Sequence, residues 1–320
     1  MVNENIISNL EALLLLYKKD STLKFKCKAL NTSISAIKSY NQEIKCGKQA
    51  MNDIKGVGKG IAERIDEILE SGTLTELGIK NEKNDIMELL KSVTGVGDTR
   101  AEKWFEMGIK SIDELRNAIK DSTIKSTHHI DLGLKYYDDL KERIPRAEMD
   151  MLKSSVETHI KAVDKDIIFE VCGSYRRGLP TSGDIDILVS HSKYMENISN
   201  EKILSKIVKY METTGFLVDY LTKDGEKKYM GFCKLGPKNK ARRIDIRVID
   251  YISYYAGVIY FTGSQHFNIE VRNKALEKGM SLSEYGLVNQ DTKEKIFLKS
   301  EAELFEILKI PYKTPQERNI

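Results

Sequence analysis

Apolar residues recur every three or four positions through the first 144 residues of the chain, which contain no proline. This spacing places apolar side chains on one face of a helix. Examples are 61–69, which Gly72 is expected to end, and 112–119, for which Ser111 provides a cap. The pattern predicts that this half of the chain is almost entirely helical.

Past Pro145 the pattern changes to short runs rich in β-branched and aromatic residues, bounded by Gly or Pro. These runs predict strands at 167–172, 185–189, 229–235 and 243–248. Helical spacing returns at 149–162, 201–211 and 268–277. We therefore expect a helical half followed by an α+β half, with the boundary near residues 143–145.

The helical half contains an internal repeat, in which Gly-Val-Gly at 56–58 is echoed by Gly-Val-Gly at 95–97, 39 residues later. Two glycines around one apolar residue permit a tight turn with positive φ between two helices. The second helix then offers free N–H groups and the positive end of its dipole to an anion. One copy is equally consistent with a plain helix turn. Two copies with basic residues nearby favour helix-hairpin-helix motifs that hold DNA phosphates without reading sequence.

Charge and composition narrow the class of protein. The chain has 51 Lys and Arg against 48 Asp and Glu, too balanced for a protein that coats a polyanion along its whole length. Residues 1–60 carry ten Lys or Arg against five Asp or Glu, so a polyanion contact is expected there first. No apolar run approaches the ~20 residues that cross a bilayer, and no leader peptide opens the chain. The four cysteines form no CxxC pair, which indicates reduced thiols of a soluble intracellular protein without structural zinc.

Three aspartates are candidates for metal binding. Asp184 and Asp186 lie two residues apart on a predicted strand and therefore project from the same face. Two such carboxylates repel each other unless a cation joins them, although a solvated strand edge is the alternative for this pair alone. Asp245 lies on a second alternating strand, between Arg243 and Arg247. Three carboxylates suit a pair of Mg²⁺ ions that also draw on phosphate oxygens of a substrate.

The segment 173–178, Gly-Ser-Tyr-Arg-Arg-Gly, follows a predicted strand, and its first residue precedes Asp184 by 11 positions. A glycine turn, a hydroxyl and two arginines can cradle a triphosphate next to the metals, whereas the plain alternative is a basic loop. The combination of Gly-Ser, the spaced Asp pair and a later strand Asp is much more specific than its parts. It is the signature of the nucleotidyltransferase superfamily.

At these motifs the chain resembles the family X DNA polymerases, most closely the beta-type members. The likeness runs from about residue 20 to the end and is densest at 95–97, 128–149, 171–188, 242–247 and 260–285. The resemblance implies an α+β fold: an all-helical N-terminal half with two helix-hairpin-helix motifs, a nucleotidyltransferase-type palm, and a small α+β nucleotide-selecting subdomain. The expected domains are 1–85 (lyase-like), 86–144 (helical, DNA-binding), 145–250 (palm) and 251–320.

The resemblance also implies a function: template-directed filling of short DNA gaps in base-excision repair. A nucleotide would pass from a dNTP to the primer 3′-hydroxyl with two Mg²⁺ ions, for which Mn²⁺ can substitute. The expected partners are gapped or nicked DNA and dNTPs, with no membrane and a monomeric state. The expected location is the nucleus for a cellular eukaryotic protein, or the cytoplasm for a viral one. The alternatives are template-independent nucleotidyl transfer, transfer to RNA or a small molecule, or a DNA-end-binding module with an inactive palm. The hairpins argue against transfer to RNA or a small molecule, and the three aspartates argue against an inactive palm.

Site residues follow from the same resemblance. Asp184 and Asp186 would bind both metals, and Asp245 would bind the catalytic metal and accept the primer hydroxyl proton directly or through water. The expected nucleotide-binding residues are Arg146, Gly173, Ser174, Arg177, Ser182, Gly183, Tyr260, Phe261, Gly263 and Asn268. The expected DNA-binding residues are Lys26, Gly56, Gly58, Lys59, Gly95, Gly97, Arg243 and Arg272. Backbone carbonyls that would hold Na⁺ or K⁺ at the hairpins are those of Asn52, Ile54, Val57, Lys91, Val93 and Val96.

The chain departs from the family pattern in its N-terminal domain. Arg64 stands where repair members carry the lysine that forms a Schiff base with an abasic deoxyribose. A guanidinium stays protonated and cannot act as an amine nucleophile. Gly60 and Leu30 replace a lysine and a tyrosine of the family's pocket, while Lys26 matches. The 5′-deoxyribose phosphate lyase activity is therefore expected to be weak or lost.

Overall fold

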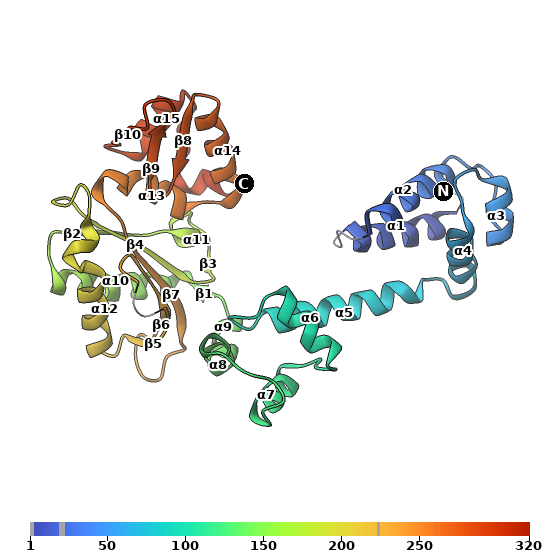
Figure 1. The fold of residues 1–320 in the computed structure, drawn as a ribbon, viewed down its shortest axis with the longest axis horizontal. Coiled ribbons are helices and arrows are strands. Elements are labelled where there is room, and N and C mark those ends of the chain that lie inside the picture. Colours follow the sequence, from blue (N-terminus) through green and yellow to red (C-terminus); the bar gives the residue numbers. More distant parts are fainter. Residues whose placement is uncertain (1–2, 19–22, 223–224) are drawn as a thin grey trace. The chain divides into compact units, whose positions relative to one another are not determined.

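The computed structural model describes residues 3–18, 23–222 and 225–320. The chain divides into two compact units, Met1–Lys125 and Ser126–Ile320. The first is helical and the second combines helices with sheets (Figure 1). This confirms the α+β fold class with a helical N-terminal part. Among the described residues, no helix is long and apolar enough to cross a membrane.

The N-terminal unit begins with four helices around one apolar core (Figure 1). They are α1 (Glu4–Lys18), α2 (Lys24–Lys38), α3 (Gly47–Asp53) and α4 (Lys59–Ser71). Gly47 permits close approach of α3 to α4, because a Cβ there would lie 2.0 Å from the carbonyl oxygen of Ala62. As predicted, Gly72 ends α4 in the left-handed conformation, with φ of 81°.

Three further helices complete this unit: α5 (Thr75–Lys91), α6 (Asp98–Glu106) and α7 (Ile112–Lys120). The cap predicted for α7 is confirmed, because the Ser111 side chain accepts a hydrogen bond from the backbone N–H of Glu114. Both Gly-Val-Gly segments are interhelical turns. Gly56 has φ of +107° between α3 and α4, and Gly95 has φ of +90° between α5 and α6. Glycine tolerates this backbone region without steric cost.

The second unit is built on a five-stranded sheet of order β2-β4-β7-β6-β5. The strands are β2 (Ile167–Val171), β4 (Ile185–His191), β5 (Leu217–Thr222), β6 (Lys228–Cys233) and β7 (Arg242–Val248). β4 and β7 run parallel, and the other neighbours are antiparallel. Four strands lie where the sequence pattern predicts them. We did not predict β5, whose pairing with β6 is interrupted by two register shifts.

Helices cover one face of this sheet. α10 (Arg146–Val163) and α12 (Ile203–Thr213) pack on alternate residues of the strands and form the largest core with them. α8 (His128–Lys135) and α9 (Tyr137–Lys141) precede them in this unit. A short pair, β1 (Ile144–Pro145) with β3 (Thr181–Ser182), and the single turn α11 (Gly173–Arg176) lie at the edge that faces the candidate active site. Single 3-10 turns occur at Ile198–Glu201, Tyr251–Ser253 and Pro315–Arg318.

The last part of the chain forms a small α+β layer of its own (Figure 1, orange to red). It contains α13 (Tyr254–Thr262), α14 (Gln265–Leu276) and α15 (Glu301–Leu308). A three-stranded antiparallel sheet joins β8 (Met280–Ser283), β9 (Gly286–Asn289) and β10 (Lys295–Ile296). Phe267 and Phe305 stack at the centre of its core.

Candidate active site and N-terminal pocket

The predicted aspartates lie on or next to two neighbouring parallel strands. Asp186 of β4 and Asp245 of β7 are register partners in the ladder, and Asp184 immediately precedes β4. Ile185 and Ile187 alternate with them and are buried beneath the sheet, as the period of two requires. The structure thus brings the carboxylates of Asp186 and Asp245 onto the sheet face opposite α10 and α12.

Burial and mutual repulsion control the charge of these carboxylates. Burial, with the charges of Asp184 and Asp245, raises the pKa of Asp186 to about 7. Burial also raises the pKa of Asp245, although the neighbouring guanidinium of Arg243 opposes this rise. Nη2 of Arg243 lies 2.7 Å from Oδ1 of Asp245. In the described part of the chain, Nη1 of Arg243 is buried without a hydrogen-bond partner.

The donor set fits divalent cations. Three carboxylates supply the oxygen ligands that Mg²⁺ prefers, and their mutual repulsion is the feature that a cation relieves. Asp186 and Asp245 line a cavity of about 190 Å³ together with Arg247 and Phe261. Gly173, with φ of +59°, borders Asp186 so closely that a Cβ there would lie 2.5 Å from its Oδ2. The glycine therefore keeps the carboxylate free of a side chain from α11.

The residues predicted to hold phosphates gather around α11 in the same unit. Ser174 lies within this turn, and Arg177 follows it. Ser182 is buried on β3, where it pairs with Ile144, two residues before Arg146. Arg177 contacts acceptors of the chain itself: its Nη1 donates to the carbonyl of Thr262 at 2.6 Å and its Nε to Oδ1 of Asn319 at 2.8 Å.

The segment predicted to face the sugar ends α13. Tyr260 and Phe261 are partly buried with their rings edge to face, and the guanidinium carbon of Arg247 lies 4.9 Å from the Phe261 centroid. The Asn268 side chain donates to the carbonyl of Tyr260 at 2.7 Å, which links α14 to α13. Arg272 is exposed on α14.

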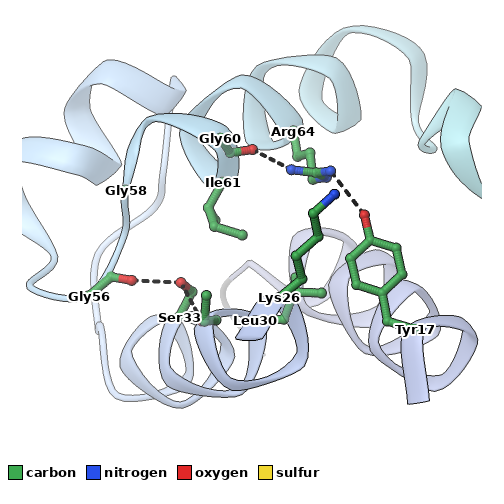
Figure 2. Close-up of a pocket in the computed structure, with 10 residues that line it drawn as sticks. Tyr17, Lys26, Leu30, Ser33, Gly56, Gly58, Gly60, Ile61 and Arg64 are labelled. Atoms are coloured by element: carbon green, nitrogen blue, oxygen red, sulfur yellow. Dashed lines mark hydrogen bonds between the residues drawn. The ribbon is translucent and has the colours of Figure 1, made fainter. Parts of the chain in front are cut away.

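A separate pocket of about 320 Å³ lies in the N-terminal unit between α2 and α4 (Figure 2). It is lined by Tyr17, Lys26, Ala29, Leu30, Ser33, Gly56, Gly58, Gly60, Ile61 and Arg64. The first hairpin therefore forms one wall. Among the described residues, Lys26 makes no ion pair, and its ammonium lies 5.9 Å from the Tyr17 ring centroid. Lys59 does not line the pocket; its side chain is 86% exposed.

Arg64 is held by contacts that the sequence did not reveal. Its Nη2 donates to Oε2 of Glu76 at 2.7 Å. Figure 2 shows its other two contacts: Nη2 donates to the Tyr17 hydroxyl at 3.1 Å, and Nη1 donates to the carbonyl of Gly60 at 2.8 Å. Burial and a hydrogen bond to Glu76 raise the pKa of Tyr17 to about 12. Burial disfavours the charged guanidinium, but Glu76 and Tyr17 more than offset this and raise the pKa of Arg64.

Two of the hairpin carbonyls predicted to bind a cation already accept a hydrogen bond within the chain. The carbonyls of Ile54 and Val93 accept turn hydrogen bonds from Val57 and Val96 at 3.1 and 3.0 Å. A carbonyl oxygen has a second lone pair, so these contacts leave room for a cation ligand. The cation-binding role of the six predicted carbonyls stays a prediction.

One further cluster has the composition of a metal site. Ligand atoms of Asp164, Asp166 and His191 all lie within 4.8 Å of one another, the only such group in the described ranges. The backbone N–H of Lys193 donates to Nδ1 of His191 at 3.2 Å, and the Lys193 ammonium lies 3.0 Å from Asp166. Nε2 of His191 then carries its proton towards Asp164. Contacts within the chain therefore already engage the side chains of this cluster.

Comparisons with known proteins match almost every part of the chain. Residues 1–74 match a helix-hairpin-helix domain, 88–141 the fingers domain of DNA polymerase lambda, 143–251 the DNA polymerase beta palm and 257–319 the DNA polymerase beta thumb. The chain is 32% identical to DNA polymerase lambda of Rattus norvegicus over 332 aligned positions, 99% of this chain. The chain belongs to family X of the DNA polymerases.

A second family X relative, DNA polymerase lambda of Arabidopsis thaliana, is 32% identical over 309 positions, which cover 90% of this chain. The chain spans little more than half of these two relatives, 56% and 57% of their lengths. The family palm and thumb models fall on the unit that carries the three aspartates and the α11 turn.

Sequence reasoning missed the residues that hold the predicted ones in place. Glu76 supports Arg64 from the next helix, and no local spacing signals that contact. Arg242 is 4% exposed and donates to both carboxylate oxygens of Glu148 at 2.7 Å. Here a signal was present, because Arg242 alternates with Ile244 and therefore lies on the core face of β7.

Proposed function

We propose that this chain is a template-directed DNA polymerase that fills short gaps during DNA repair. The observation that supports the proposal most directly is the register pairing of Asp186 with Asp245, which opens into a cavity beside the α11 turn. In-line nucleotidyl transfer needs negative oxygen ligands next to a place for a triphosphate. The chain is expected to act as a monomer on gapped or nicked DNA.

Asp184, Asp186 and Asp245 would hold two Mg²⁺ ions, with Mn²⁺ as a substitute. When bound, such ions supply Lewis-acid charge that acidifies a hydroxyl and neutralises phosphate oxygens. Asp245 would accept the primer 3′-hydroxyl proton, directly or through water. Arg243, which now holds Oδ1 of Asp245, would turn to the primer phosphate. The same carboxylates would bind the metal ions and take part in the reaction. The bound cations must therefore neutralise the carboxylate charge before the nucleotide is transferred.

The incoming nucleotide would bind to residues of the α11 turn and of the segments next to it. Ser174, Arg177 and Arg146 would hold phosphates together with Ser182 and Gly183. Since Arg177 donates to Thr262 and Asn319 in this structure, it would exchange these partners for phosphate oxygens. Tyr260, Phe261 and Gly263 would pack against the sugar, and Asn268 would meet the base.

DNA binding would rest on backbone N–H groups and basic side chains rather than on base contacts. Gly58 and Gly97 are the N-caps of α4 and α6, where an anion is favoured, and Gly56 and Gly95 lie in the turns just before them. Na⁺ or K⁺ at the hairpin carbonyls would bridge to phosphate. Lys26 and Lys59 would add positive charge near the first hairpin, and Arg272 would contact the template strand.

The N-terminal pocket would anchor a 5′-phosphate without lyase chemistry. Arg64 cannot supply a neutral amine, and its donors already serve Glu76, Tyr17 and Gly60. Lys26 would be the cation available to the phosphate. The expected result is a polymerase that holds both sides of a gap and depends on another activity to remove the sugar phosphate.

A one-nucleotide gap in a primer–template duplex tests the proposal. Each dNTP is offered singly, with Mg²⁺ or with a chelator, to the parent and to Asp245→Ala. We expect addition of the complementary nucleotide alone, only with Mg²⁺ and only by the parent. Addition to an unpaired primer with any dNTP would favour template-independent transfer. DNA binding without any addition would favour an end-binding module.

A further inference from the structure

Arg146 is fastened along one side to the loop that follows α11. Its backbone N–H donates to the carbonyl of Pro180 at 3.0 Å. Its Nη1 donates to the carbonyls of Tyr175 and Leu179 at 3.0 and 3.4 Å. In the part of the chain that the structure describes, Nε and Nη2 of Arg146 make no hydrogen bond. One edge of the guanidinium is therefore committed to the loop, and the other edge can bind a ligand.

The ring of Tyr175 supports the face of this guanidinium. The guanidinium carbon of Arg146 lies 4.6 Å from the ring centroid, within the range of a cation–π contact. The ring is partly buried and packs against the palm core, and this packing fixes its position. An exposed arginine otherwise samples many rotamers, and ordering it on ligand binding costs conformational entropy.

The Tyr175 hydroxyl closes the arrangement. It donates to Oδ1 of Asp150 at 2.7 Å, and Asp150 lies one turn after Arg146 on α10. Burial and this hydrogen bond raise the pKa of Tyr175, so its hydroxyl remains a donor at neutral pH. The Tyr175 side chain is thus fixed at both ends: its hydroxyl is bound to α10, and its backbone is part of α11. The guanidinium of Arg146 packs on the ring between these two points.

We propose that Tyr175 is a positioning residue that aims the free edge of Arg146 at the triphosphate of the incoming nucleotide. This inference rests on the proposed function, because it takes the α11 turn as the phosphate site. Tyr175 itself touches no substrate. It keeps the Arg146 side chain in one conformation before the nucleotide binds. Without this support, the conformational entropy lost on ordering Arg146 would weaken nucleotide binding.

A double-mutant cycle separates positioning from packing. The four proteins are the parent, Tyr175→Leu, Arg146→Ala and the double variant, measured by steady-state gap filling over a range of dNTP concentrations. Loss of the stacked ring in Tyr175→Leu should raise KM for dNTP by about five- to tenfold, with a smaller change in kcat. In the Arg146→Ala background the same substitution should change KM by less than about twofold, because the group it aims is already gone.

Two further variants serve as controls. Tyr175→Phe keeps the ring and should restore KM to within about twofold of the parent. Tyr194→Leu removes another tyrosine that is packed against the same palm core and whose ring lies tilted against His191, with the ring centroids 4.9 Å apart. It should lower the melting temperature as much as Tyr175→Leu does, without changing KM. Equal KM effects of Tyr175→Leu in both Arg146 backgrounds, or a Phe variant as impaired as the Leu variant, would overturn the proposal.

A binding measurement keeps this test independent of turnover. Inorganic tripolyphosphate with Mg²⁺ is titrated calorimetrically into the same four proteins. Weaker binding of tripolyphosphate to Tyr175→Leu than to the parent, with no such difference in the Arg146→Ala background, supports the positioning role. This holds even if the parent adds no nucleotide, because failure to add a nucleotide would reject only the proposed function. Identical affinities for the parent and Tyr175→Leu reject the positioning role even if gap filling is intact.

Discussion

Oε2 of Glu76 accepts hydrogen bonds from both Nη2 and Nε of Arg64, at 2.7 and 3.3 Å. The pair stands beside the N-terminal pocket, and each side chain is about a quarter to a third exposed. Two features therefore argue against imine chemistry in this pocket: the side chain at position 64 is a guanidinium, and the neighbouring Glu76 carboxylate would keep a lysine at that position protonated. The contact with Glu76 is visible only in the structure.

Borohydride trapping on a pre-incised abasic duplex should give little covalent adduct with the parent. An imine needs a neutral amine, which attacks the sugar aldehyde and releases water, and Arg64 supplies none. Arg64→Lys alone should also trap poorly, because the opposite charge of Glu76 favours the ammonium form. Arg64→Lys combined with Glu76→Gln should trap about tenfold more than Arg64→Lys, which corresponds to one unit of lysine pKa. A strong adduct on the parent would contradict this, and mapping it would identify the lysine involved.

Asp245→Ala should abolish nucleotide addition and leave DNA affinity nearly unchanged. The carboxylate is proposed to bind a metal and to accept the proton of the attacking hydroxyl, whereas DNA affinity is proposed to come from backbone amides and basic side chains. Loss of such a group costs several kcal/mol in the transition state. Gap filling and fluorescence anisotropy of labelled gapped DNA measure the two properties separately. Turnover within about tenfold of the parent would remove Asp245 from the site.

Divalent metal should stabilise the parent against heat through the palm aspartates. An ion present at about 100 times its dissociation constant adds about 2.7 kcal/mol to the free energy of unfolding. Without metal, Asp186→Asn should melt no lower than the parent, since it removes a buried charge that Asp184 and Asp245 repel. Calorimetry with Mg²⁺ or a chelator should show a metal-dependent rise in the parent that shrinks in Asp186→Asn. Equal rises in both proteins would place the metal elsewhere.

DNA affinity should fall steeply with salt and show little sequence preference. The hairpin amides and Lys26 are proposed to contact phosphates rather than bases, and each neutralised phosphate adds about −0.9 to the slope of log K against log salt. Competition between duplexes of different sequence at one salt concentration checks the second half of the prediction. A strong preference for one sequence would indicate base contacts.

Replacement of Tyr260 or Phe261 by alanine should raise ribonucleotide incorporation relative to deoxyribonucleotide incorporation. The segment is expected to exclude a 2′-hydroxyl by bulk, and a smaller side chain removes that bulk. Phe261 also stacks with Arg247 beside the Asp245 cavity, so its variant should lose some total activity as well. Tyr260→Phe is the matched control and should keep the parent's ratio. An unchanged ratio in both alanine variants would show that the segment does not face the sugar.

The sequence by itself determined the local features of this protein. Helical spacing before Pro145 and alternation after it predict the two halves, because burial of one face requires those periods. Gly56 and Gly95 mark the interhelical turns, since positive φ is costly for other residues. Strand alternation placed Asp184 and Asp186 on one face and buried Ile185 and Ile187. Each of these signals lies within a few residues of the feature that it predicts.

Only the tertiary structure decided which distant groups meet. Parallel pairing of β4 with β7 sets Asp245 opposite Asp186, and a slip of one residue would have turned it into the core. Glu76 reaches Arg64 from another helix, and the Tyr175 ring on α11 meets Arg146 on α10. Such contacts depend on how whole elements pack, because burial and charge compensation act between surfaces rather than along the chain. The local pattern therefore indicates the chemistry, while the packing decides which of its groups are free to perform it.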